Sequence, residues 1–91
     1  MVPVRIYVTE RCGYCRAAEA LLERKGVPFE AIDCTGDRET RDRLVEQTGR
    51  RTVPQIFIAG VPIGGFEDLA KLEKSGELDG ILAGERAPDP V

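Results

Sequence analysis

The chain has 91 residues, of which 42% are hydrophobic and 32% charged. This length gives one small domain with a single core, and the composition is typical of a folded soluble protein rather than a disordered one. The formal net charge of -3 disfavours binding to nucleic acid, whose protein partners usually carry a basic balance. No apolar run approaches the ~18 residues that span a bilayer and no signal-peptide pattern opens the chain, so we expect a cytoplasmic protein that binds no membrane. We also expect a monomer.

The predicted elements begin with a strand, a helix and a second strand. Residues 3–9 carry β-branched and aromatic side chains between a proline and a polar turn, which is typical of a strand. Residues 13–25 place apolar side chains at helical spacing, and Gly26 can take the positive φ that ends a helix. Residues 28–34 predict the second strand. These three elements indicate a βαβ unit with parallel strands.

Residues 35–49 predict a second, more polar helix, with Asp37 as its N-cap and Gly49 as its stop. Residues 53–65 predict two short strands joined by a turn at Ala59-Gly60, which is a hairpin signal.

Residues 66–83 are apolar in helical period, and Ser75-Gly76 breaks them into two short helices. Residues 1–84 therefore form one α/β domain of order βαβαββαα, with a four-stranded mixed sheet flanked by helices. The polar, proline-rich residues 85–91 form a flexible tail.

The chemistry of the chain depends on its three cysteines, Cys12, Cys15 and Cys34, in the absence of any histidine. An odd number without a secretion signal does not match a disulfide framework. A closed zinc site needs four ligands, usually Cys or His, so zinc would have to recruit a carboxylate or a second subunit. The pattern therefore favours reactive thiols. We expect Cys34, after the second strand, to be a small buried hydrophobe rather than a regulatory thiol.

Cys12 and Cys15 flank the predicted start of the first helix. Unpaired N–H groups and a partial positive charge at this end stabilise a thiolate over a thiol, and Arg11 and Arg16 add positive potential. We therefore expect Cys12 to be the nucleophile. Cys15, on the face turned toward the sheet, resolves a mixed disulfide formed at Cys12. Alternatively, Cys12 and Cys15 could be two small core residues without a chemical role. Their position between a strand and a helix favours a redox-active pair.

Two further segments leave local alternatives open. Val53-Pro54 precedes a strand, either as a plain edge signal or as a cis peptide that presents the Val53 backbone to an extended peptide. Local cues favour trans, since only about 5–6% of X–Pro bonds are cis. The Gly64-Gly65 pair precedes Glu67 and Asp68 at a helix start. Its amides suit a carboxylate, and the acidic residues equally suit the helix dipole.

Three segments together resemble the glutaredoxin family: CGYC at 12–15, TVPQIFI at 52–58 and IGGFEDL at 63–69. The resemblance extends over residues 4–83, and the order of predicted elements agrees with the thioredoxin fold of that family. It implies a glutathione-disulfide oxidoreductase that reduces glutathione mixed disulfides and protein disulfides. The implied partners are glutathione, glutathionylated or disulfide-containing proteins and, through glutathione, glutathione reductase.

The resemblance also implies roles for individual residues. Cys12 attacks the glutathione sulfur of a mixed disulfide, and a second glutathione or Cys15 cleaves the adduct. The Val53 backbone pairs with the cysteinyl part of glutathione, beside a cis Pro54. The Phe66 and Glu67 amides, with the Asp68 carboxylate, hold the γ-glutamyl end. The expected glutathione-binding residues are Arg11, Tyr14, Arg51, Thr52, Val53, Pro54, Phe66, Glu67 and Asp68.

The chain departs from the family pattern at Thr9 and Gly13. Many members have a basic residue at the first position, so Arg11, Arg41 or Arg51 is expected to supply the charge for the glycyl carboxylate. Many have proline at the second position. Because some relatives with glycine there hold a [2Fe–2S] cluster between two subunits, a cluster carrier ligated by Cys12 and glutathione is the alternative function. A third possibility is that a thioredoxin-reductase-type flavoenzyme, rather than glutathione, reduces the protein. The IGGFEDL segment disfavours this possibility, because it resembles the part of the family's site that holds the γ-glutamyl group.

Overall fold

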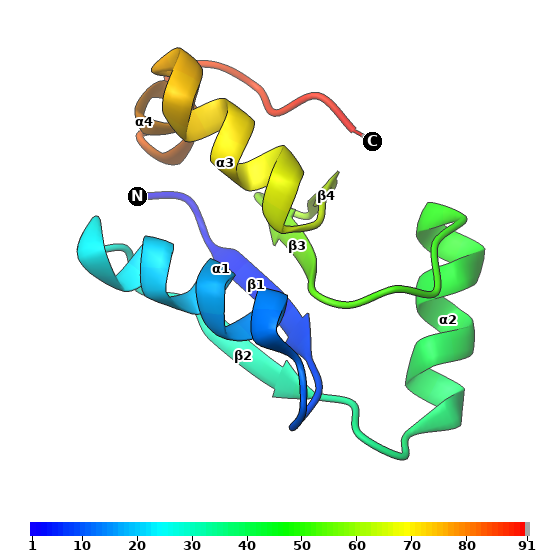
Figure 1. Ribbon diagram of the computed structural model, residues 1–91. Coiled ribbons are helices and arrows are strands. Elements are labelled where there is room, and N and C mark those ends of the chain that lie inside the picture. Colours follow the sequence, from blue (N-terminus) through cyan, green and yellow to red (C-terminus); the bar gives the residue numbers. More distant parts are fainter. Residues whose placement is uncertain (91) are drawn as a thin grey trace.

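The structure, a computed structural model, describes residues 1–90 and contains the elements in the predicted order (Figure 1). Its strands and helices are β1 Val4–Val8, α1 Gly13–Arg24, β2 Glu30–Asp33, α2 Arg38–Thr48, β3 Gln55–Ile58, β4 Val61–Gly64, α3 Phe66–Ser75 and α4 Glu77–Leu82. Within this described part, no helix is long and apolar enough to cross a membrane.

The four strands form one mixed sheet in the order β2-β1-β3-β4. β1 pairs parallel with β2 and antiparallel with β3, which pairs antiparallel with β4. On one face of the sheet α1 and α3 pack against each other, and α2 stands apart from them (Figure 1). This arrangement confirms the predicted thioredoxin-like fold.

The strand register determines which loops meet at one edge of the sheet. Tyr7 near the end of β1 lies opposite Gln55 at the start of β3, and Ile56 lies opposite Gly64 at the end of β4. The segment after β1, the segment before β3 and the segment after β4 therefore emerge side by side. These are the three segments that carry the sequence motifs.

Local signals in the sequence account for the helix boundaries. The Asp37 carboxylate accepts a hydrogen bond from the Thr40 N–H at 3.1 Å and caps α2, as predicted. Gly49 ends α2 with φ 75°, and Gly76 separates α3 from α4 with φ 81°, in the left-handed region that glycine takes without a Cβ clash. The predicted break at Ser75-Gly76 is confirmed.

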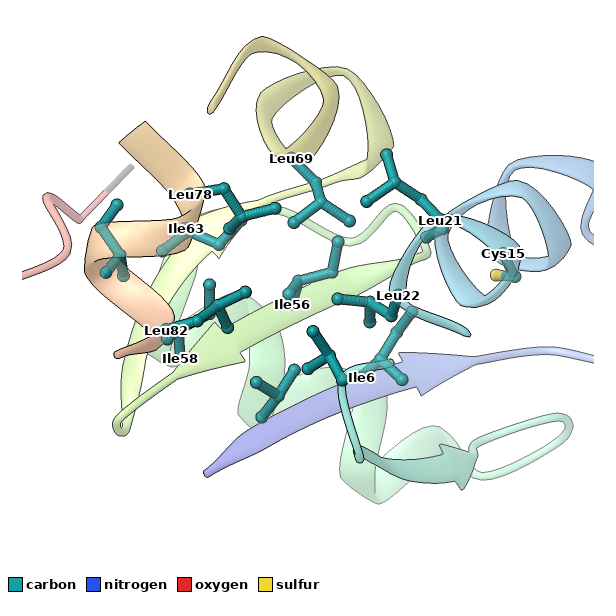
Figure 2. Close-up of a cluster of buried hydrophobic side chains, with 14 of the residues drawn as sticks. Ile6, Cys15, Leu21, Leu22, Ile56, Ile58, Ile63, Leu69, Leu78 and Leu82 are labelled. Atoms are coloured by element: carbon teal, nitrogen blue, oxygen red, sulfur yellow. The ribbon is translucent and has the colours of Figure 1, made fainter. Parts of the chain in front are cut away.

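The core lies between the sheet and the helices α1, α3 and α4 (Figure 2). Ile6, Ile56 and Ile58 extend from the central strands toward Leu22 of α1 and Leu69 of α3, and all five side chains are fully buried. Successive side chains of a strand point to opposite faces of the sheet, so these apolar residues of β1 and β3 bury one face of it.

Two ion pairs of one lysine also connect the end of α1 to the C-terminal helices. The Lys25 ammonium lies 2.7 Å from the carboxylates of Glu73 in α3 and Asp79 in α4. Hydrogen bonds to Asp79 and Glu73 raise the pKa of Lys25. This contact holds the C-terminal end of α1 in place relative to α3.

Part of the predicted tail contacts α4. The Glu85 N–H donates to the Gly80 carbonyl at 2.9 Å, and Arg86 pairs with Glu77 at 3.5 Å. The tail prediction covered residues 85–91, of which Val91 lies outside the described residues, and its flexibility stays a prediction.

Replacing Ile56 with alanine should lower the free energy of unfolding by about 2–5 kcal/mol, because it removes three methyl(ene) groups from a fully buried site on a central strand. Chemical denaturation followed by circular dichroism measures this loss. The control is Glu46→Ala on the exposed face of α2, for which we expect a change within about 0.5 kcal/mol. Equal effects of the two substitutions would contradict the core described above.

Candidate active site

Cys12 is the N-cap residue of α1, and its sulfur lies between a backbone N–H and a backbone carbonyl. With extended backbone (φ -138°, ψ 104°), Cys12 places Sγ 3.1 Å from the Cys15 N–H, which donates to it. The same Sγ lies 3.7 Å from the Val53 carbonyl, to which a thiol can donate. The N-terminal end of α1 therefore presents a backbone donor directly to the one cysteine sulfur that is not buried.

Cys15 is the buried member of the pair. Its side chain lies on the inner face of α1 and is fully buried (Figure 2). Burial, and secondarily the hydrogen bond with the Cys12 side chain, raises the pKa of the Cys15 thiol to about 12. Cys15 therefore stays protonated at neutral pH. The predicted difference in exposure between the two cysteines is confirmed.

Cys34 is also fully buried, as expected. Its thiol donates to the Val8 carbonyl at 3.3 Å, and burial raises the pKa of this thiol. All three cysteines are free in the structure, and Cys12 alone is not buried. The chemistry of the site therefore begins at Cys12.

A groove of about 350 Å³ opens beside Cys12 between α1, the segment before β3 and the start of α3. Its lining residues are Tyr14, Arg50, Thr52, Val53, Pro54, Gly65, Phe66, Glu67 and Asp68. The structure thus brings together every residue of the predicted binding set except Arg11 and Arg51. The lining includes Val53, whose carbonyl lies 3.7 Å from the Cys12 sulfur, so the groove and the accessible thiol are neighbours.

The aromatic wall of the groove is formed by Tyr14 and Phe66. Their ring centroids lie 6.0 Å apart with an interplanar angle of 32°, and Tyr14 is 62% exposed. On the facing side, the Val53–Pro54 peptide is cis. The local expectation of a trans bond was therefore wrong, whereas the expectation from the family resemblance is confirmed.

The far end of the groove carries charges and backbone donors. Phe66 and Glu67 open α3, where N–H groups have no acceptor within the helix. Asp68 Oδ2 accepts from the Gly65 N–H at 2.9 Å and from Arg50 Nη1 at 3.1 Å. This end of the groove therefore presents a carboxylate, a guanidinium and helix amides to any ligand.

The arginines named from the sequence lie elsewhere. Arg11 is exposed outside the groove lining, and Arg51 pairs with Asp42 of α2 at 2.9 Å. Arg41 donates to the Arg51 carbonyl at 2.7 Å. The arginine in the groove is Arg50, which the sequence analysis missed. Two adjacent arginines pointed to a cation near this site, but the loop that follows α2 decides which one faces the groove.

Across residues 1–90, no group of three or more His, Cys, Asp and Glu side chains is arranged to hold a metal ion. A [2Fe–2S] cluster takes four ligands. Because Cys15 and Cys34 are fully buried, one chain offers it Cys12 alone, and the other ligands would come from outside the chain.

A thioredoxin fold with one accessible thiol at a helix N-cap, one buried thiol a turn later and a groove beside them defines a thiol–disulfide oxidoreductase. The family model described as Glutaredoxin matches residues 4–63. The chain therefore belongs to the glutaredoxin family.

Individual relatives extend this match over almost the whole chain. A glutaredoxin of Pseudomonas aeruginosa is 48% identical over 83 residues, which cover 91% of this chain and 99% of that protein. The solution structure of glutaredoxin from Brucella melitensis superimposes with a TM-score of 0.84 and 46% identity, over 94% of both chains. The crystal structure of a buckwheat glutaredoxin–glutathione complex has a TM-score of 0.87 and 27% identity, covering 97% of this chain and 83% of that one.

The buried thiols should ionise only when the protein unfolds. Burial raises the pKa of both Cys15 and Cys34 from the ordinary value of 9.0. Their contribution to stability is therefore complete below pH 9 and is lost as the pH rises through the folded-state values. In a Cys12→Ser variant at pH 9, thiolate absorbance at 240 nm should be lower in the folded protein than in denaturant, where both thiols are exposed. Equal absorbance in the two states would contradict the burial of these thiols.

Proposed function

We propose that this protein is a glutathione-dependent thiol–disulfide oxidoreductase that reduces glutathione mixed disulfides and protein disulfides. The observation that carries the proposal is the position of Cys12 Sγ, 3.7 Å from the Val53 carbonyl that lines the groove. A disulfide sulfur attacked by Cys12 would belong to a peptide lying along that backbone. We extend the proposal to the cytoplasm, because a thiol pair that has to return to its reduced form suits a reducing compartment. We also propose that the protein acts as a monomer.

Glutathione suits the groove in three parts. Its cysteinyl unit would pair with the Val53 main chain as an added strand segment, which leaves its sulfur at Cys12. Its γ-glutamyl end would reach the Phe66 and Glu67 amides and Asp68. Its glycyl carboxylate would face the opposite way, where Arg11, Arg41 and Arg51 stay the predicted cations. The buckwheat relative, solved with glutathione, supports this choice of ligand.

The first chemical step is a thiol–disulfide exchange. The Cys12 thiolate attacks the glutathionyl sulfur of the substrate, a Cys12–glutathione disulfide forms, and the substrate disulfide breaks. The target leaves as a thiolate and takes a proton from water. The Cys15 N–H donates to the Cys12 sulfur at 3.1 Å and so holds this sulfur in place at the start of α1.

The adduct can then be cleaved in two ways. A second glutathione thiolate attacks the glutathionyl sulfur, releases oxidised glutathione and restores the Cys12 thiolate. Alternatively, Cys15 attacks the Cys12 sulfur and releases reduced glutathione, leaving a Cys12–Cys15 disulfide. Because burial holds the pKa of Cys15 near 12, the first route dominates when glutathione is abundant. The second serves protein disulfides, whose reduction needs two thiols from the enzyme.

Replacing Cys12 with serine should abolish reduction of a glutathione mixed disulfide, because the variant has no other accessible thiol. Cys15→Ser should retain activity within a few-fold of the unmodified protein, since glutathione itself cleaves the adduct. Steady-state turnover of the β-mercaptoethanol–glutathione disulfide, coupled to glutathione reductase and NADPH oxidation, measures both. Substantial turnover by Cys12→Ser, or none by the unmodified reduced protein, would contradict the proposal.

A further inference from the structure

The main chain of Arg50 is held by a partly buried polar network that includes Thr48 and Gln55. Gln55, which is 3% exposed and is the one buried polar residue within residues 1–90, donates through Nε2 to the Arg50 carbonyl at 2.6 Å. Thr48 Oγ1 accepts from the Arg50 N–H at 3.1 Å and donates to Gln55 Oε1 at 2.9 Å. Both backbone polar groups of Arg50 are thus fixed from inside the protein. The main chain therefore aims this side chain at the groove before any ligand arrives.

The Arg50 side chain ends at the charged end of the groove. Its Nη1 lies 3.1 Å from Asp68 Oδ2, which also accepts from the Gly65 N–H at 2.9 Å. The side chains are 43% and 34% exposed, so neither charge is sealed from a ligand. A guanidinium presents five N–H donors in a planar fork, and the bond to Asp68 leaves others for a second carboxylate.

The γ-glutamyl group of glutathione carries a free ammonium and a free carboxylate on one carbon. Asp68 attracts the ammonium. The carboxylate then lies beside Asp68, where a neighbouring anion would repel it unless a cation stood near. Helix amides at Phe66 and Glu67 supply partial positive charge, whereas Arg50 supplies a full charge with bidentate geometry.

We propose that Arg50 is a specificity-determining residue that binds the α-carboxylate of the γ-glutamyl group while Asp68 binds the adjacent ammonium. The inference rests on the proposed function of the groove. In the free protein Arg50 and Asp68 neutralise each other. In the complex the ligand ammonium lies beside Asp68 and the ligand carboxylate lies beside Arg50, so that each charge has a neighbour of opposite sign. A peptide thiol without the α-carboxylate leaves Arg50 without this partner.

Three mixed disulfides with 5-thio-2-nitrobenzoate separate the two ligand charges. One contains glutathione, the second contains 4-aminobutyryl-cysteinylglycine, which lacks the carboxylate, and the third contains glutaryl-cysteinylglycine, which lacks the ammonium. Release of the coloured thiolate in stopped flow gives the second-order rate constant for attack by Cys12. The variants are Arg50→Gln and Arg50→Lys. The matched control is Arg43→Gln, which removes the same charge from α2, where Arg43 pairs with Glu39 at 2.9 Å.

We expect Arg50→Gln to lower the rate constant about three- to tenfold for the glutathione and glutaryl disulfides and to leave the 4-aminobutyryl disulfide unchanged. Arg50→Lys should restore part of the loss, since it returns the charge without the planar fork. Arg43→Gln should leave all three rate constants unchanged. This pattern follows only if Arg50 recognises the carboxylate.

An equal loss on all three disulfides would assign Arg50 a purely structural or long-range electrostatic role, and no loss on any would remove it from recognition. Either result overturns the inference. Failure of the proposed function looks different, because the unmodified protein would then react with all three disulfides at one rate or not at all.

Discussion

The register of the antiparallel pairs around β3 is the constraint on which the site depends. With Tyr7 opposite Gln55 and Ile56 opposite Gly64, three chain segments meet at one edge of the sheet. One brings the thiol, one the peptide backbone and one the start of α3. A one-residue slip would turn the buried isoleucines of β3 outward, so the core that fixes the register also fixes the active site.

Burial divides the chemistry between the two cysteines. Cys12 is the N-cap of α1 and Cys15 lies in its first turn, and the two differ in how far each side chain is buried. Cys12 caps the helix at the mouth of the groove, where its sulfur meets the Cys15 N–H and the Val53 carbonyl. Cys15 points into the core, where desolvation raises its pKa to about 12. Two identical side chains thereby become a nucleophile and a reserve thiol.

Periodic and capping signals sufficed to predict the element order and the helix ends, because these depend on neighbours in the sequence. Asp37, Gly49 and Gly76 all act as expected. The Val53–Pro54 isomer could not be predicted locally, and it followed only from the family resemblance. The choice of Arg50 over Arg51 was missed because it depends on Gln55, a buried residue whose role appears only once β3 is paired.

The proposed function places glutathione attached to Cys12 along Val53, with its γ-glutamyl end at the start of α3. The most direct measurement is the change in backbone amide NMR shifts when the Cys15→Ser protein is glutathionylated on Cys12. We predict that the largest changes fall on Tyr14, Val53 and residues 65–68, with contacts between γ-glutamyl protons and the Phe66 amide. Changes centred on the opposite face of the sheet, around Tyr7 and Phe57, would contradict the account.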